Sequence, residues 1–167
     1  MARRKAPVKR RSRPTLAIVC GLPGAGKTTH AKRLERILPA VRFCPDEWME
    51  ALRLDLYDQN RRAKIVALQW KLAQRLLSRG VSVVIEWGTW ARSERDALRT
   101  RARALGAAVE LYYLTAPADV MLKRIQRRGR ENPPIRRELF MRWCKAFEAP
   151  TKQELALFDR PTWVGRK

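Results

Sequence analysis

A glycine-rich octapeptide between an apolar run and a helical segment constrains the fold more than any other feature of this sequence. Residues 15–20 form a short apolar run, which is typical of a strand covered on both faces. The octapeptide Gly21-Leu22-Pro23-Gly24-Ala25-Gly26-Lys27-Thr28 follows directly, and residues 27–38 then form a helical pattern that ends at Pro39. A strand, a glycine-rich turn and a helix in this order predict a phosphate-binding loop (P-loop, or Walker A motif) in an α/β protein.

The residue types in this loop suit a polyphosphate ligand. Glycines let successive backbone N–H groups converge on one anion, and the start of the following helix adds partial positive charge. We expect Lys27 to bridge the β- and γ-phosphates in catalysis and the Thr28 hydroxyl to hold Mg²⁺. The expected ligands are ATP and Mg²⁺, although no base-reading motif decides between ATP and GTP. The predicted nucleotide-binding residues are Gly21, Pro23, Gly24, Ala25, Gly26, Lys27, Thr28 and Thr29.

Short apolar segments alternate with longer helical ones through the rest of the chain. This alternation predicts a three-layer α/β/α sandwich with a mostly parallel sheet, the P-loop NTPase fold. We expect helix caps at Asp46 and capping boxes at Ser93 with Asp96 and at Thr151 with Glu154. The further strands are expected at 40–44, 81–85 and 109–114, and the further helices from residue 46 and at 59–79, 93–106, 117–128 and 136–147.

The chain is predicted to hold one domain at 15–158, between a flexible basic arm at 1–14 and a tail at 159–167. The arm contributes seven positive charges to a net charge of +21, so the remaining residues still carry +14. Such a field attracts polyanions and leaves open a contact with nucleic acid. However, arginine outnumbers lysine by 27 to 10, which a GC-rich genome would also produce.

The composition gives no indication of a membrane or secreted protein. No segment approaches the roughly 20 apolar residues that a membrane span needs. The three cysteines are too few and too scattered for a disulfide framework or a zinc site. A cytoplasmic location is therefore expected.

The sequence resembles the small P-loop phosphotransferases. The resemblance rests on residues 21–29, on Asp46 after the second expected strand, on Glu86 after the third and on the arginine-rich segment 124–130. That group includes the 5′-kinase domain of phage polynucleotide kinase, zeta toxin and chloramphenicol phosphotransferase. Segments 44–48 and 86–90 are similar to bacterial AAA-type ATP-binding proteins and predicted kinases, and that resemblance spans about residues 15–158. It implies a P-loop kinase fold and transfer of the γ-phosphoryl group of ATP to a hydroxyl.

The resemblance also implies roles for the two carboxylates. Asp46 occupies the place of the group that accepts the proton of the attacking hydroxyl, although it could instead only cap the following helix. Glu86 stands where related proteins often carry an aspartate, so it could reach the magnesium shell or position the acceptor. The alternative for Glu86 is an ion pair with a nearby arginine.

A basic segment follows the fourth expected strand. In helical geometry Arg124, Arg127 and Arg128 share one face, because they are spaced at i, i+3 and i+4. In the proteins that the chain resembles, such a segment folds over the nucleotide as a lid, and arginines stabilise the transferring phosphoryl group. We therefore expect a lid at about 124–134 with catalytic roles for Arg124 and Arg128, a solvated basic face being the alternative.

Three tryptophans follow the second and third expected strands. We expect Trp48, Trp87 and Trp90 at the rim of the cleft, where together with Asp46 they could bind a planar acceptor, although core packing explains them equally well. The phage polynucleotide kinase pattern has an arginine where this chain has Met49, which weakens the case for a nucleic-acid end and leaves room for a small-molecule hydroxyl.

The sequence therefore predicts an ATP- and Mg²⁺-dependent kinase acting on a hydroxyl of a small molecule or nucleotide-like acceptor. Two alternatives remain open at this stage. One is a 5′-hydroxyl polynucleotide kinase that uses the basic arm and lid to hold nucleic acid. The other is a nucleic-acid-binding ATPase or switch in which water replaces the acceptor.

Overall fold

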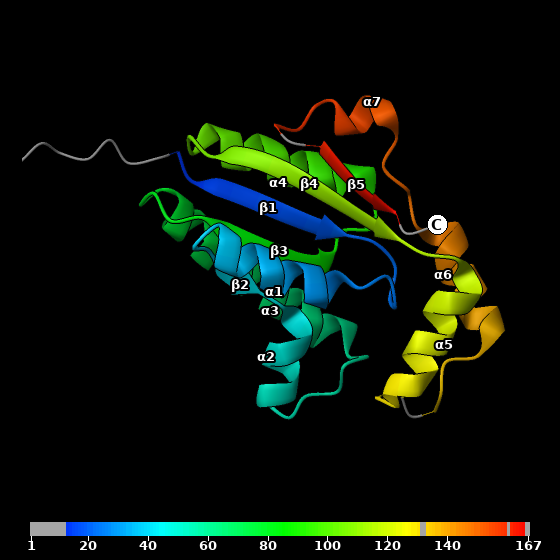
Figure 1. Ribbon diagram of the computed structural model, residues 1–167. Helices are drawn as coiled ribbons and strands as arrows, with labels where there is room; N and C mark the ends of the chain where they lie inside the picture. Colours follow the sequence, from blue (N-terminus) through cyan, green and yellow to red (C-terminus); the bar gives the residue numbers. More distant parts are fainter. Residues whose placement is uncertain (1–12, 131–132, 160, 166–167) are drawn as a thin grey trace, which may run out of the picture.

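A parallel sheet of five strands lies at the centre of the computed structural model, which describes residues 13–130 and 133–159 and the backbone of 161–165 (Figure 1). The strands pair in the order β2-β3-β1-β4-β5, and every neighbouring pair is parallel. Because β1 is central, the loop that leaves it opens between its two neighbours, where α/β proteins of this kind bind ligands. The strands are β1 (Thr15–Cys20), β2 (Val41–Phe43), β3 (Val83–Gly88), β4 (Ala108–Thr115) and β5 (Pro161–Gly165).

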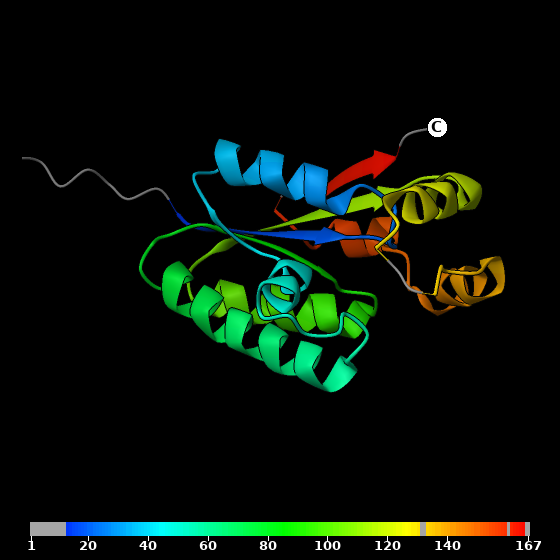
Figure 2. The same cartoon turned by 90° about the horizontal axis from the view of Figure 1, so that it is seen from below.

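Helices cover both faces of the sheet, as Figure 2 shows. One face carries α1 and α5, and the opposite face carries α3 and α4 side by side. The predicted three-layer sandwich is therefore confirmed. The helices are α1 (Lys27–Ile37), α2 (Pro45–Ala51), α3 (Gln59–Leu77), α4 (Arg92–Ala104), α5 (Ala118–Arg128), α6 (Arg137–Ala146) and α7 (Lys152–Leu155).

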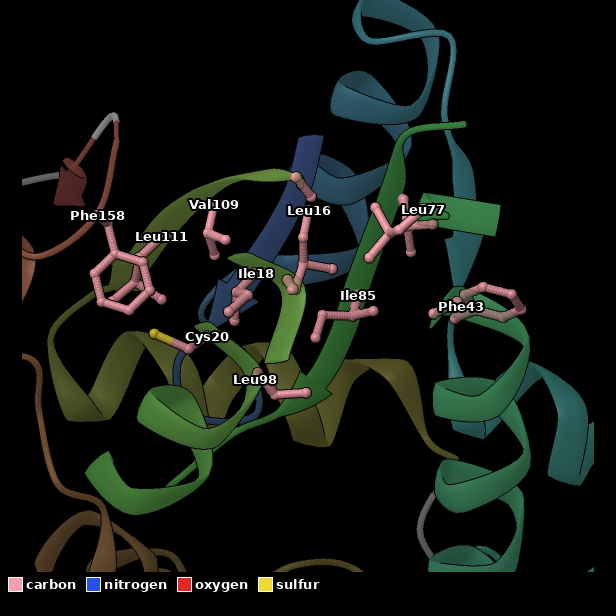
Figure 3. Close-up of a cluster of buried hydrophobic side chains, with 14 residues drawn as sticks. Leu16, Ile18, Cys20, Phe43, Leu77, Ile85, Leu98, Val109, Leu111 and Phe158 are labelled. Carbon is pink, nitrogen blue, oxygen red and sulfur yellow. The ribbon is translucent and has the colours of Figure 1, made fainter. Parts of the chain in front are cut away.

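Successive side chains of β1 point to opposite faces of the sheet, so they contribute to two separate parts of the core. Leu16 and Ile18 are fully buried against α3 and α4, in the cluster drawn in Figure 3. Ala17 and Val19 point to the other face and pack with residues of α1, α5 and α6. Fully burying a leucine or isoleucine side chain stabilises a fold by about 1.5–3 kcal/mol. The apolar run at 15–20 is thus explained by helices on both sides of the strand.

Two strands differ from the prediction by more than one residue at an end. β3 begins and ends later than expected, so Glu86 and Trp87 belong to the strand and do not leave its end. β5 falls in the segment 159–167 that was predicted to be a tail, and it pairs in parallel with β4. A five-residue strand at the sheet edge has too short a pattern to stand out in the sequence.

The helix caps were predicted with mixed success. Asp46 is the second residue of α2, and the N-cap is Cys44. Ser93 lies inside α4, where Glu94 instead accepts a hydrogen bond from the backbone N–H of Ala91, at 3.1 Å. The cap at Thr151 is confirmed, because its hydroxyl accepts from the N–H of Glu154.

The end of the predicted basic arm belongs to the fold. The Arg13 guanidinium donates to the carbonyl oxygens of Gly106 at 3.0 Å and of Ala107 at 2.8 Å. The carbonyl of Pro14 accepts from the N–H of Ala108. The other arm residues, 1–12, lie outside the described residues. None of the helices described here combines the length and apolar character that crossing a membrane requires.

Candidate active site

A cleft of about 840 Å³ lies at the carboxyl edge of the sheet. Figure 1 shows α5 and α6 beyond the carboxyl ends of β1 and β4, so the loops after the strands face these helices. The cleft brings together residues that are far apart in the sequence and that were predicted to act at one site. These are Pro23, Gly24, Gly26, Lys27, Thr28, Thr29, Asp46, Glu86, Trp87, Trp90, Arg124 and Arg128.

The P-loop needs glycine at the position where it packs against α5. Gly24 has a φ of 82°, and a Cβ atom there would lie 2.5 Å from the carbonyl oxygen of Met121. Gly26, with a φ of 97°, is the N-cap of α1, and this left-handed conformation suits glycine best. The loop can therefore turn its backbone amides toward one ligand at the start of α1, which is the arrangement that binds phosphate groups.

Lys27 extends from the first residue of α1 back over the loop. Its Nζ donates to the carbonyl oxygen of Leu22, at 3.1 Å. Burial lowers the pKa of the Lys27 ammonium to about 8, while the nearby carboxylates of Asp46 and Glu86 act in the opposite direction. The side chain is thus held in place and desolvated, and an anionic ligand in the cleft would stabilise its charged form.

Asp46 lies in the first turn of α2, and its side chain is about half exposed in the cleft. It forms an ion pair with Arg62 of α3, a residue that also lines the cleft and that the sequence analysis did not identify. The arginine can orient the carboxylate, because its five N–H donors have a fixed geometry. Arg62 lies sixteen residues away, so only the packing of α3 beside α2 reveals the pair.

Glu86 forms an ion pair with Arg42 of β2, which is the alternative that the sequence left open for it. The Glu86 carboxylate is almost fully buried, and a buried charge needs such a partner. Arg42 also contacts Glu47, at 2.6 Å, and Glu35, at 3.3 Å. Burial lowers the pKa of Arg42, but Glu47 and Glu86 outweigh it and raise the pKa overall. In the sequence, the indication of this ion pair was Arg42 itself, a charged residue between the apolar Val41 and Phe43 of a short strand.

A magnesium ion bound with a nucleotide fits the donors of the cleft. Among the described residues, no group of three His, Cys, Asp or Glu side chains could hold a metal ion alone. Thr28 lines the cleft, whereas the Glu86 carboxylate is buried and held by Arg42, so Thr28 is the better placed of the two predicted metal ligands. Mg²⁺ prefers oxygen ligands and is commonly completed by substrate phosphates and water, so a bound nucleotide would supply the missing ligands.

The basic helix α5 borders the cleft on the side opposite α2. Arg124 donates from Nη1 to the carbonyl oxygen of Gly24 in the P-loop, at 3.1 Å. Arg127 and Arg128 line the same cleft, so the predicted shared face is oriented toward the site. Arg130 forms an ion pair with Glu50 of α2, at 3.3 Å. Part of the predicted lid, residues 131–132, lies outside the described residues.

The predicted tryptophans lie in different surroundings. Trp87 and Trp90 line the cleft, whereas Trp48 packs edge-to-face on Phe43 and is not among the lining residues. Trp90 is packed against Trp143 of α6, which also lines the cleft and which the sequence analysis did not identify. An aromatic pair therefore forms one wall of the site.

Comparisons with known proteins show the family and the fold of this chain. A family model described as "AAA domain" matches residues 16–150. No curated protein matches the chain. Solved structures show the fold, each with low sequence identity.

Three of these structures are informative. A candidate kinase from Chloroflexus aurantiacus J-10-fl has a TM-score of 0.71 and 20% identity, over 92% of this chain and 89% of the other. Kti12 from Chaetomium thermophilum, in complex with ADP-AlF3, has a TM-score of 0.67 and 18% identity, over 90% of this chain and 88% of the other. A chain of the Pnkp1/Rnl/Hen1 RNA repair complex has a TM-score of 0.68 and 18% identity, over 94% of this chain but 50% of the other.

Proposed function

From the premise that the chain belongs to the AAA domain family and has a P-loop kinase fold, we propose that it is an ATP- and Mg²⁺-dependent phosphotransferase. It would move the γ-phosphoryl group to a hydroxyl of a small molecule or nucleotide-like acceptor. One observation carries the proposal: Lys27 from the P-loop, Asp46 from α2 and the arginines of α5 line a single cleft.

Each group of cleft residues would have a separate role in the phosphoryl transfer. The P-loop amides and Lys27 would bind the β- and γ-phosphates, and Thr28 would hold Mg²⁺, which supplies neutralisation of charge on the phosphate oxygens. Asp46 would accept the proton of the acceptor hydroxyl while the hydroxyl oxygen forms a bond to the γ-phosphorus. The bond from phosphorus to the bridging oxygen then breaks, and ADP leaves. Arg124 and Arg128 would stabilise the negative charge on the transferring group.

Asp46 favours an acceptor hydroxyl over simple nucleotide binding. A switch protein needs no base, whereas a kinase needs a group that orients the hydroxyl and accepts its proton. Asp46 is exposed to the cleft and is held by Arg62. These features suit a carboxylate that contacts a second substrate.

A second candidate function is phosphorylation of a 5′-hydroxyl end of nucleic acid. The observation in its favour is the group of arginines at the cleft, Arg127, Arg128 and Arg130. Against it, Met49 is fully buried at the place where the phage polynucleotide kinase pattern has its acceptor-binding arginine. We therefore favour the small-molecule acceptor.

Transfer of label from γ-labelled ATP separates these functions. The protein would be incubated with Mg²⁺ and with 5′-hydroxyl oligonucleotides, nucleosides or a panel of hydroxylated antibiotics. Label on a small acceptor supports the proposal, and label on oligonucleotide ends supports the second candidate. Release of phosphate alone, stimulated by DNA or RNA, would indicate an ATPase or switch and contradict both.

A further inference from the structure

A second cavity of about 650 Å³ lies between α3 and α4, and we call it the α3–α4 groove. It adjoins the active-site cleft, since Gln59, Arg62 and Trp87 line both spaces. Its volume lies in the range of small-molecule sites, roughly 300–1,000 Å³. Continuity with the cleft makes the groove a place for the part of an acceptor that is remote from its hydroxyl.

The groove is apolar and flanked by aromatic rings. Small side chains, Ala63 and Ala67 of α3 and Ala97 of α4, leave the space between the two helices open. Trp70 and Trp87 border it as an edge-to-face pair, with ring centroids 6.0 Å apart. A flat apolar group fits such walls better than a compact polyol does, because it replaces water on the ring faces.

Two buried polar atoms on groove residues lack hydrogen-bond partners. Thr89 is 6% exposed, and its Oγ1 atom has no partner. The Nε1 atom of Trp87 is also buried without one. Buried polar groups are nearly always hydrogen-bonded in native proteins, so a small turn of either side chain toward the groove would gain a hydrogen bond from an occupant. Thr89 also has a φ of 41°, a strained conformation for a β-branched residue.

The charged side chains of the groove already have partners within the chain. Arg62 pairs with Asp46, and the Arg101 Nε donates to the side-chain oxygen of Gln74, at 2.7 Å. Glu94 accepts from the N–H of Ala91. Asp46 neutralises Arg62, and the charges of Arg101 and Glu94 are opposite in sign, so the groove has no net charge that would favour a charged occupant.

Building on the function proposed above, we propose that the phosphoryl acceptor is an alcohol with a flat, uncharged aromatic body. Its hydroxyl lies at Asp46, and its rings lie in the α3–α4 groove against Trp70 and Trp87. If the Trp87 and Thr89 side chains turn toward the groove, the indole N–H can donate a hydrogen bond to an oxygen or nitrogen atom of the acceptor, and Thr89 Oγ1 can bond to the same molecule. A compact sugar acid would leave this groove unfilled.

Binding of aryl alcohols tests the groove without any chemistry. The probes are 2-phenylethanol, 2-naphthaleneethanol and tryptophol, titrated calorimetrically into the wild-type chain without nucleotide. Ala67→Phe fills the groove, and Ala104→Phe places the same side chain at an exposed position of α4 outside it. We expect at least one probe to bind the wild type and the Ala104→Phe variant alike, and the Ala67→Phe variant about tenfold or more weakly. Absence of binding by every probe, or equal binding to both variants, would overturn the proposal.

Phosphoryl transfer from γ-labelled ATP then separates the two proposals. With the bound probe as acceptor, we expect Ala67→Phe to raise KM far more than it lowers kcat, because the groove holds only the remote part of the acceptor. Efficient labelling of D-gluconate or of a 5′-hydroxyl oligonucleotide, unchanged by Ala67→Phe, would overturn the groove and leave the kinase function standing. Probe binding without transfer to any acceptor would overturn the kinase function and support the groove as a binding site.

Discussion

At the scale of single residues, Lys27 links the proposed binding of an anion to the pH. Its ordinary pKa of 10.5 is lowered to about 8, mainly by burial. Between these values the unfolded chain binds more protons than the folded one, so Lys27 makes the ligand-free protein more stable as the pH rises through this window. A bound polyphosphate has the opposite preference, because it attracts the protonated form. As the pH rises through this window, the free energy of unfolding of the ligand-free protein should therefore increase, whereas its affinity for a polyphosphate should decrease.

The pH dependence of MgATP binding follows from this residue. We expect the affinity to be steady near pH 7 and to weaken as the pH rises above about 8, with proton uptake on binding that increases over the same range. Calorimetry in buffers of different ionisation enthalpy measures that uptake. In a Lys27→Arg variant that still binds, the profile should be flat, because the guanidinium stays protonated. An affinity in the wild type that is constant to pH 9.5 would contradict the assignment.

Asp46 is the second residue whose role can be isolated. Asp46→Asn keeps the shape of the side chain but removes its basicity, so we expect phosphoryl transfer to fall about 10²–10⁴-fold with MgATP affinity nearly unchanged. Single-turnover transfer and nucleotide titration measure the two quantities separately. Asp55→Asn, in the turn after α2, serves as the control, since Asp55 is not among the cleft-lining residues. An unchanged transfer rate would reduce Asp46 to a structural residue of α2.

At the scale of elements, a buried arginine joins α4 to the connection after β3 and to the segment that leads from α6 into α7. Arg95 is fully buried and pairs with Glu154 of α7, at 2.6 Å. It also donates to the carbonyl oxygens of Thr89, at 2.9 Å, and Trp90, at 3.1 Å, and to that of Glu148, at 2.8 Å. These contacts fix the connection after β3, which carries Trp90 into the active-site cleft.

Loss of this arginine should destabilise the whole fold. Arg95→Met leaves the Glu154 carboxylate buried without a partner, so we expect the free energy of unfolding to fall by about 3–5 kcal/mol. Arg92→Met on the same helix removes only an exposed pair with Asp96 and should change it by less than about 1 kcal/mol. Denaturant titrations of the two variants make the comparison. Equal free energies of unfolding for Arg95→Met and Arg92→Met would show that the buried contacts of Arg95 contribute little to the stability of the fold.

At the scale of the whole molecule, the sequence predicted the layers better than the contacts. The alternation of apolar strands and amphipathic helices determines the sandwich, and the P-loop motif locates the cleft. The pairs Asp46–Arg62 and Glu86–Arg42 span 16 and 44 residues, so they depend on how α3 and β2 pack. Trp143 and β5 lie far from any motif, and their places follow only from the assembled sheet and the packing of α6. Trp48 shows that proximity to a strand end does not place a side chain in the cleft.

The charge of the molecule also acts as a whole. Because Arg13 is bonded to the fold, the segment to remove is residues 1–12, which carry six basic residues. Their deletion should weaken any oligonucleotide binding and flatten its dependence on salt, since fewer counterions are released. It should leave turnover of a small acceptor unchanged. Fluorescence anisotropy at several salt concentrations measures the slope, and a slope equal to that of the full chain would contradict an electrostatic role for this segment.

Titration of MgATP into the wild-type chain and into Lys27→Ala tests the central claim most directly, with Lys32→Ala as the matched control on the exposed side of α1. We predict saturable binding of one nucleotide by the wild type and by Lys32→Ala, and none by Lys27→Ala over the same concentrations. Equal binding by all three proteins, or no binding of MgATP or MgGTP by the wild type, would contradict the assignment of this loop as the phosphate site.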